Sequence, residues 1–331
     1  MRESGSENVI TSRVRLARNL RGLPFRLTDE ILAERLGRQI FRSVSQEDDF
    51  RFVKLSDCSK EKLCALKEKN LISNALIDNR RCAQAIISFD NALSVMIGEE
   101  DVIREQCVLS GTSIREAYVR LQRIDDKITR DFDVAFSEQL GYLTACPTNV
   151  GTGLRASVMM FLPALTESGN VKDLVEETRR TGLTVRGAYG EGSDSEGYLY
   201  QISNEVTLGF SEDRIISEVE KAVRIIVGAE REETEKLFGK NRIVSFDKAK
   251  RAFGILKNAM LLSYDELLSL VTDIRIGRIL GLEGLPPNKV LSELIIGARP
   301  YSVREYSGDD DGDEEKIRAD FTRNTLSFFR E

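Results

Sequence analysis

The stretch Val9-Ile10-Thr11-Ser12-Arg13-Val14-Arg15-Leu16-Ala17-Arg18, close to the start of the chain, alternates as a β-strand does. Successive side chains of a strand point to opposite faces, so Arg13 and Arg15 are expected on the same face. Two guanidinium groups on one strand face repel each other unless an anion joins them. The stretch therefore predicts a sheet and, on one face of that sheet, an anion site.

Strand and helix patterns are mixed over the rest of the first 240 residues. β-like runs lie at 83–89, 92–97, 102–109 and 198–210, and helical spacing is found at 28–45, 113–133, 156–165, 171–181 and from 211 onward. Thr28 is the expected N-cap of the first helix. Many connections between strands are too short for repeated βαβ units. We therefore predict an α+β fold in which helices flank an antiparallel sheet.

The pattern becomes helical from about residue 241. Candidate helices lie at 246–262, 263–279 and 287–296. This change predicts two domains, at 1–240 and 241–331, of which the second is all-helical. The acidic run Ser307–Glu315 is expected to be a solvated linker within it.

Composition excludes several classes of protein. The net charge of −6 gives no basic footprint for nucleic acid, and no apolar stretch approaches the ~20 residues that cross a bilayer, so a cytoplasmic protein without membrane contact is expected. The five cysteines are odd in number and lack C-x-x-C pairs, which favours reduced thiols over disulfides or a thiolate zinc site. The chain has no histidine, so acid–base chemistry falls to carboxylates, lysine, tyrosine or a thiol.

The run Cys146-Pro147-Thr148-Asn149-Val150-Gly151-Thr152-Gly153-Leu154-Arg155 combines a thiol, a turn, two glycines and a guanidinium. Glycines let backbone N–H groups approach a ligand, and Arg155 can fork onto phosphate oxygens, so the run predicts a phosphate-binding loop that leads into a helix. Two other interpretations stay open. Gly151-x-Gly153-x-x-Ala156 fits a dinucleotide fingerprint, and Cys146 by itself is typical of a buried small hydrophobic residue.

A second glycine-rich run, Val185–Ser193, contains Arg186 and Glu191. The glycines suit a lid that closes over a substrate. By itself, Glu191 is more typical of a solvated loop acid. Together the two loops supply a thiol, a carboxylate and two arginines, which is more chemistry than packing requires.

Four stretches taken together resemble, in the same order, the guanidino (phosphagen) kinase family. They are Thr11–Asn19, Glu99–Arg104, Cys146–Val158, and Arg186–Gly197 followed by Tyr200–Asn204. The arginine strand begins within the first fifteen residues, without the helical N-terminal domain of creatine and arginine kinases. This arrangement, and the segment Ser263–Gly281, is similar to the bacterial protein-arginine kinases of the family.

The resemblance implies a function and a set of site residues. The expected activity is transfer of the γ-phosphoryl group of ATP, with Mg²⁺, to arginine side chains of proteins. No metal ligand of the chain's own is implied. The implied catalytic residues are Glu100, Glu191 and Cys146, and the implied phosphate-binding residues are Arg13, Arg15, Arg104, Arg155 and Arg186.

The resemblance also implies partners. These are proteins with exposed arginines, a zinc-binding activator protein, a Clp-type unfoldase that receives the marked proteins, and a second copy of the chain in a homodimer. Two alternative functions stay open. One is a kinase for free arginine or another small guanidine, and the other is a catalytically weak adaptor of a Clp unfoldase.

The chain departs from the family pattern at two places. The family usually reads Asn-Glu-Glu-Asp-His-Leu-Arg, where this chain has Gly98 and Val102 in place of the asparagine and the histidine. The phosphoarginine-binding Arg-Asp-x-x-Arg-Ala motif of the C-terminal domain corresponds to Glu314–Ala319, in which Arg318 remains but an acid replaces the first arginine. We therefore expect no activation by free phosphoarginine.

Overall fold

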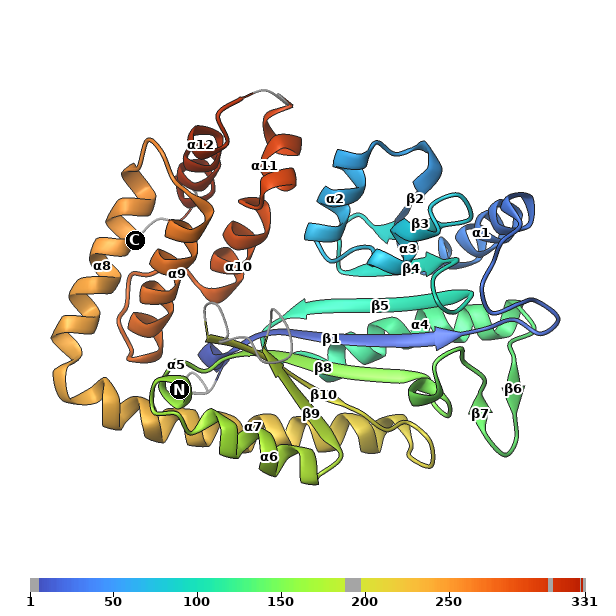
Figure 1. Ribbon diagram of the computed structural model, residues 1–331, viewed down its shortest axis with the longest axis horizontal. Helices are drawn as coiled ribbons and strands as arrows, with labels where there is room; N and C mark the ends of the chain where they lie inside the picture. Colours follow the sequence, from blue (N-terminus) through green and yellow to red (C-terminus); the bar gives the residue numbers. More distant parts are fainter. Residues whose placement is uncertain (1–5, 188–197, 309–311, 328, 330–331) are drawn as a thin grey trace.

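The computed structural model describes residues 6–187, 198–308, 312–327 and 329. Within them, eight strands form one antiparallel sheet in the order β2-β3-β4-β5-β1-β8-β10-β9 (Figure 1). Their bounds are β1 (Val9–Arg18), β2 (Phe50–Lys54), β3 (Gln84–Ser88), β4 (Leu93–Ile97), β5 (Ile103–Ser110), β8 (Leu154–Phe161), β9 (Leu183–Gly187) and β10 (Leu199–Asn204). A small hairpin is made by β6 (Phe136–Ser137) and β7 (Gly141–Tyr142). The predicted antiparallel α+β architecture is confirmed.

Helices cover one face of the sheet along most of its width. They are α1 (Glu30–Val44), α4 (Ile114–Asp131), α5 (Pro163–Glu167), α6 (Val171–Arg180) and α7 (Glu212–Leu237). Val14 and Leu16 of β1 point into the apolar core between this face and the helices. The other face is covered over β2–β4 by α2 (Lys60–Glu68) and α3 (Asn74–Asp78), which share a smaller core with Ala85 and Met96.

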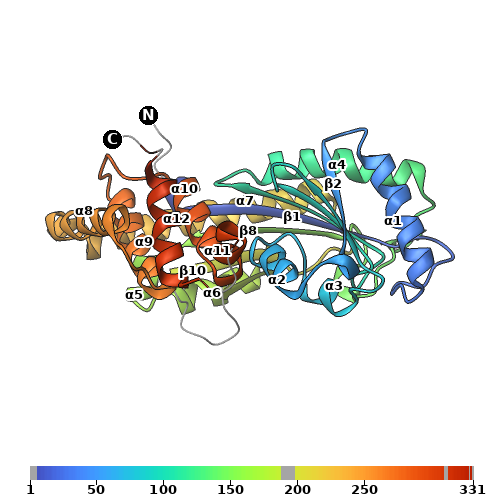
Figure 2. The same ribbon diagram turned by 90° about the horizontal axis from the view of Figure 1, so that it is seen from above.

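The C-terminal helices have a hydrophobic core of their own, which includes Phe253, Leu267 and Leu294. They are α8 (Arg242–Asn258), α9 (Tyr264–Ile279), α10 (Asn288–Gly297), α11 (Pro300–Ser307) and α12 (Glu314–Ser327). Arg278 of α9 forms an ion pair with Glu7, just before β1, and α11 packs beside α2 (Figures 1 and 2). The helical domain therefore touches the sheet domain at two separate places.

Two local predictions are wrong. Residues 156–165 are not one helix, because they contain most of β8 and the start of α5. β8 lies between β1 and β10 and is buried on both faces over much of its length, so it reads as a continuous apolar run that periodicity does not distinguish from a buried helix. The N-cap of α1 is Asp29 rather than Thr28, since the Asp29 carboxylate accepts the N–H groups of Ile31 and Leu32 at 2.9 and 3.0 Å.

The predicted acidic linker is shorter than the sequence indicated. Helix α11 extends to Ser307, and Glu314 and Glu315 already belong to the first turn of α12. Acidic residues are favourable there because the N-terminus of a helix carries a partial positive charge. In the part of the chain that the structure describes, no helix is long and apolar enough to span a membrane.

Candidate active site

The register of the central strands brings the predicted phosphate-binding arginines to one face of the sheet. Arg15 of β1 lies opposite Arg155 of β8, and Ala17 lies opposite Arg104 of β5. Further along the sheet, Gln201 of β10 lies opposite both Met159 of β8 and Arg186 of β9. Side chains directly opposite each other share a face, and so do those two residues apart on one strand. We call this side of the sheet the arginine face; its arginines are Arg13, Arg15, Arg104, Arg155 and Arg186.

Three of these arginines have a lowered pKa, to which neighbouring arginine charges contribute. Burial, together with the charges of Arg104 and Arg155, lowers the pKa of Arg13 to about 10. Burial and the neighbouring charges, Arg13 first, hold the pKa of Arg15 well below its usual range. The pKa of Arg155 is lowered by burial and then by the charge of Arg186. Like charges held this close disfavour the charged form of each, and a bound anion would remove that cost.

Two of the guanidinium groups carry donors that remain unpaired inside the protein. The Nε atoms of Arg15 and Arg155 are buried and have no hydrogen-bond partner among the residues that the structure describes. Arg155 also donates from Nη2 to the Ser203 hydroxyl, at 3.2 Å. Unpaired buried donors are costly, so their natural complement is a ligand that brings several acceptor oxygens. Phosphate groups have this chemistry.

The three acidic residues before β5, Glu99, Glu100 and Asp101, differ in their burial and contacts. Glu99 is 4% exposed and its carboxylate accepts a hydrogen bond from the Arg104 guanidinium and one, at 2.7 Å, from the backbone N–H of Glu100. Burial opposes ionisation of Glu99, but the charge of Arg104 and the hydrogen bonds to the carboxylate together outweigh it and lower the pKa of Glu99. Glu100 points outward and is exposed, and Asp101 is buried again. Glu100 is therefore the carboxylate of the three that a substrate can reach.

Cys146 lies at the start of a short 3-10 turn, Pro147–Asn149, and not at a helix as the sequence suggested. Its thiol is half-buried and its sulfur lies 3.1 Å from the Thr148 hydroxyl oxygen. A negative charge on Cys146 would partly offset the lowering of the Arg155 pKa, which places the thiol within electrostatic reach of the arginine face. The Thr207 hydroxyl fixes the loop by donating to the carbonyl of Val150 at 2.6 Å.

The two glycines of this loop serve a different purpose from the one we expected. Gly151 and Gly153 both have positive φ angles, of 116° and 66°. A Cβ atom on Gly151 would lie 2.8 Å from backbone atoms of Thr207 and Leu208, and one on Gly153 would lie 2.7 Å from the Ala17 carbonyl oxygen. Glycine is required here because the chain passes close to its own backbone.

Glu191 and the loop predicted as a lid lie outside the described residues. Arg186, near the end of β9, is exposed at the border of that segment. Within the described part, the site therefore consists of the arginine face, Glu100 and Cys146. Its other predicted carboxylate has no described position.

Sequence reasoning missed a buried ion pair on the opposite face of the sheet. Arg18, which is 1% exposed, donates from Nε and Nη2 to the two carboxylate oxygens of Asp125, both at 2.8 Å. A third donor, Nη1, donates a hydrogen bond to the Thr152 carbonyl at 2.9 Å and so holds the loop that follows Cys146. The signal was present in the alternation of β1, because position 18 faces the helices while 13 and 15 do not.

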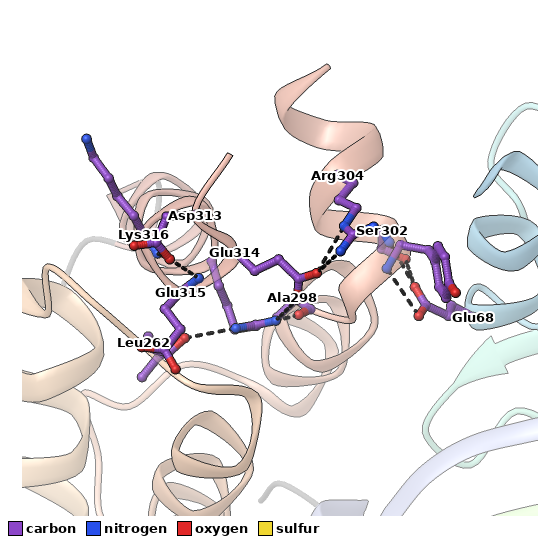
Figure 3. A network of polar contacts seen from close by, with 11 residues as sticks. Glu68, Leu262, Ala298, Ser302, Arg304, Asp313, Glu314, Glu315 and Lys316 are labelled. Atoms are coloured by element: carbon purple, nitrogen blue, oxygen red, sulfur yellow. Dashed lines mark hydrogen bonds and ion pairs between the residues drawn. The ribbon is translucent and has the colours of Figure 1, made fainter. Parts of the chain in front are cut away.

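The charged residues of the C-terminal segment Glu314–Ala319 bind other groups of the protein itself (Figure 3). Arg318 is 3% exposed and donates to the carbonyls of Ala298 and Leu262 at 2.8 and 3.0 Å. The Glu314 carboxylate forms ion pairs with Arg304, at 2.5 Å, and with Arg318, at 3.5 Å. The acid of this chain's motif thus neutralises two guanidinium groups from within the protein.

Comparison with known proteins gives two family matches that follow one another along the chain. Residues 32–233 match the family described as ATP:guanido phosphotransferase, C-terminal catalytic domain, and residues 243–331 match the Protein-arginine kinase McsB C-terminal domain. The protein-arginine kinase of Clostridium acetobutylicum is 39% identical over 332 residues, which cover 96% of this chain and 96% of the relative. That of Caldanaerobacter subterraneus subsp. tengcongensis is 38% identical over 312 residues, which cover 91% of this chain and 90% of the relative.

Two solved structures with a similar fold are a taurocyamine kinase and a lombricine kinase. The duplicated taurocyamine kinase from Schistosoma mansoni, with bound components of a transition state analog, superposes with a TM-score of 0.61 and 27% identity over 70% of this chain and 34% of that chain. Lombricine kinase superposes with a TM-score of 0.60 and 24% identity over 68% of this chain and 67% of that chain, a likeness of fold.

Proposed function

Because this chain belongs to the ATP:guanido phosphotransferase family and is a protein-arginine kinase, we propose that ATP binds with its phosphates on the arginine face and that Glu100, Glu191 and Cys146 act on the substrate guanidinium. The observation that carries this proposal is the pair of buried, unpaired Nε donors of Arg15 and Arg155 within a cluster of mutually repelling arginines. Acceptor-rich, multiply charged phosphates complement both features.

The reaction requires a poor nucleophile to be activated. A guanidinium is protonated at neutral pH and its lone pair is delocalised, so a carboxylate must orient it and accept a proton. A terminal nitrogen of the arginine side chain then forms a bond to the γ-phosphorus of ATP. The bond from that phosphorus to the oxygen it shares with the β-phosphorus breaks, and ADP leaves with the electron pair. The proton lost by nitrogen passes to a carboxylate, Glu100 or Glu191.

The protein's contribution is to position the reactants and to stabilise charge. Charge spreads over the phosphoryl oxygens in the transition state, where fixed guanidinium groups stabilise it by several kcal/mol per well-placed group, on the order of a 10³-fold rate effect. The Cys146 thiol lies within electrostatic reach of Arg155, and we propose that it polarises the substrate guanidinium.

Mg²⁺ is proposed to arrive with the nucleotide. When bound, it neutralises phosphate charge. Among the described residues no group of three or more cysteine, aspartate or glutamate side chains is arranged to hold a metal ion. The arginine face then supplies the remaining positive charge.

The proposal extends to place and partners. The resemblance to protein-arginine kinases supports a cytoplasmic enzyme that acts on proteins with exposed arginines, pairs with a second copy, responds to a zinc-binding activator protein and passes marked proteins to a Clp-type unfoldase. Pull-down of each partner class with the full chain tests this part independently of the chemistry.

Labelled ATP tests the acceptor. The full chain is incubated with two unfolded peptides of equal length that differ only in arginine or lysine at each basic position, and with free arginine. We expect label on the arginine peptide alone, and we expect acid to release it because the P–N bond is acid-labile. Label that survives acid, or that reaches free arginine but neither peptide, would contradict the proposal.

A further inference from the structure

A buried amide at the end of β1 connects three segments of the active site. Asn19 is 1% exposed. Its Oδ1 accepts the backbone N–H of Val102 at 2.8 Å, and its Nδ2 donates to Asp101 Oδ1 at 2.7 Å and to the Leu143 carbonyl at 3.0 Å. Each donor and acceptor of this side chain is therefore used to join the end of β1 to the two loops that carry Glu100 and Cys146.

Asp101 completes the connection from the other side. It is 3% exposed, and the Oδ1 atom that accepts from Asn19 also accepts the backbone N–H of Ala145, at 2.6 Å. Glu100 immediately precedes Asp101 and Cys146 immediately follows Ala145. The catalytic carboxylate and the catalytic thiol are thus each one residue away from the same buried hydrogen-bonded pair. The end of β1 and the starts of β5 and β8 lie at the same end of the sheet (Figure 1).

We infer that Asn19 and Asp101 are positioning residues that hold Glu100 and Cys146 in a fixed relation to each other. Both catalytic side chains lie on loops, and loop residues reach catalytic precision only when buried contacts fix them. The turn that carries Glu100 is held from its C-terminal side as well, because Asn19 accepts the backbone N–H of Val102. The inference rests on the proposed function of Glu100 and Cys146.

A matched control is available on the same strand. Asn8, at the opposite end of β1, is 3% exposed and donates from Nδ2 to the Phe161 carbonyl at 3.0 Å. It touches neither catalytic loop. Replacing Asn8 or Asn19 by aspartate buries a carboxylate and removes an amide donor in both cases, so general loss of stability is common to both variants.

The experiment compares Asn19→Asp, Asn8→Asp and the exchange Asn19→Asp with Asp101→Asn in the full chain. Asn19→Asp sets two carboxylates against each other, so we expect kcat to fall about 10²-fold while KM for ATP stays near that of the parent, because the arginine face is intact. Asn8→Asp should also lower Tm but retain kcat within about twofold. The exchange restores a donor between the two positions and should recover kcat at least tenfold over Asn19→Asp.

Hydrogen exchange provides a readout that does not depend on activity. Amide exchange of the peptides containing Val102 and Ala145 should be faster in Asn19→Asp and unchanged in Asn8→Asp. If Asn19→Asp does not fold, Asn19→Ser takes its place, since a hydroxyl is too short to reach both loops. Equal kcat losses in the Asn8 and Asn19 variants would overturn the inference. So would a double variant, Asn19→Asp with Asp101→Asn, whose kcat is no higher than that of Asn19→Asp. If the parent does not phosphorylate arginine but the hydrogen-exchange pattern is as expected, only the proposed function is contradicted.

Discussion

At the scale of single residues, two arginines of one strand have opposite relations to their surroundings. Arg15 faces other arginines and has an unpaired donor, whereas Arg18 faces the helices and is paired with Asp125 through two hydrogen bonds. The first arrangement makes sense only with an anionic ligand, and the second supports the fold itself. Position along the strand alone separates a ligand-binding arginine from a structural one.

Replacing each of the two by methionine should change stability in opposite directions. Arg15→Met removes repulsion from the arginine face, so Tm without nucleotide should stay equal or rise while ATP affinity falls. Arg18→Met leaves Asp125 buried without its partner, at a cost of about 3–5 kcal/mol. Thermal unfolding and ATP titration of both variants check this, and destabilisation of the Arg15 variant to the same degree as the Arg18 variant would refute the distinction.

Substitutions of the neighbouring residues Glu99 and Glu100 should change different kinetic constants. Glu100→Gln removes the charge that we propose acts on the substrate, so kcat should fall by roughly 10²-fold with little change in KM for ATP. Glu99→Gln weakens the ion pair that holds Arg104, so its main effect should be a higher KM for ATP. Steady-state kinetics with ATP and with peptide as varied substrates measure both, and identical effects would show that the two residues do not have separate tasks.

The sequence predicted part of this site for a clear physical reason. Alternation in β1 is local, so the common face of Arg13 and Arg15 could be derived without a structure. The alignment of Arg155 with Arg15 depends on strand register, and the link from Asn19 to Asp101 spans 82 positions. Periodicity carries no information about either. The resemblance grouped Arg15 with Arg155 beforehand, but nothing in the sequence analysis linked Asn19 to Asp101.

At the scale of elements, β8 shows where sequence patterns fail. A strand buried on both faces loses its alternation, so the same apolar run fits a helix or a central strand. The neighbouring connection is held by a buried carboxylate: Glu230 of α7 is 0% exposed and accepts the backbone N–H groups of Ala164 and Leu165, in α5, at 2.8 and 2.9 Å.

This contact predicts a pH-dependent stability. Burial outweighs the hydrogen bonds and raises the pKa of Glu230 to about 7. Because the folded pKa lies above the unfolded one, this group's contribution to stability is complete below the unfolded pKa and is lost as pH rises through 7, by about 3 kcal/mol in all. Glu230→Gln cannot titrate, so its Tm should improve relative to the parent between pH 5 and pH 8. Exposed Glu232→Gln should show a constant difference, and the same constant difference for Glu230→Gln would contradict the account.

At the scale of the whole molecule, the helical domain is fixed to the sheet domain by hydrogen bonds and ion pairs. Glu68 of α2 accepts the backbone N–H and the hydroxyl of Ser302 in α11, at 2.8 and 2.9 Å (Figure 3). At the adjacent contact between α11 and α12, the Glu314 carboxylate balances the charges of Arg304 and Arg318. The two domains therefore meet beside a motif whose cationic groups are already paired.

Free phosphoarginine should leave this region unchanged. The Glu314 carboxylate already lies on Arg304 and Arg318, and it would repel a phosphoryl group of like charge. Hydrogen exchange of the full chain should show no added protection of α11 and α12 when phosphoarginine is present, with peptides of the arginine face as the internal reference. Protection confined to α11 and α12 would show that other residues form a binding site for it.

Site-resolved mass spectrometry of the product tests the central claim most directly. An unfolded basic protein is incubated with ATP, Mg²⁺ and the full chain, and is then digested and analysed without acid. We predict phosphate on arginine side chains with the parent enzyme and its near absence with Arg15→Met and with Glu100→Gln. Phosphate on serine, threonine, tyrosine or lysine, or arginine phosphorylation that is unchanged in both variants, would contradict the account.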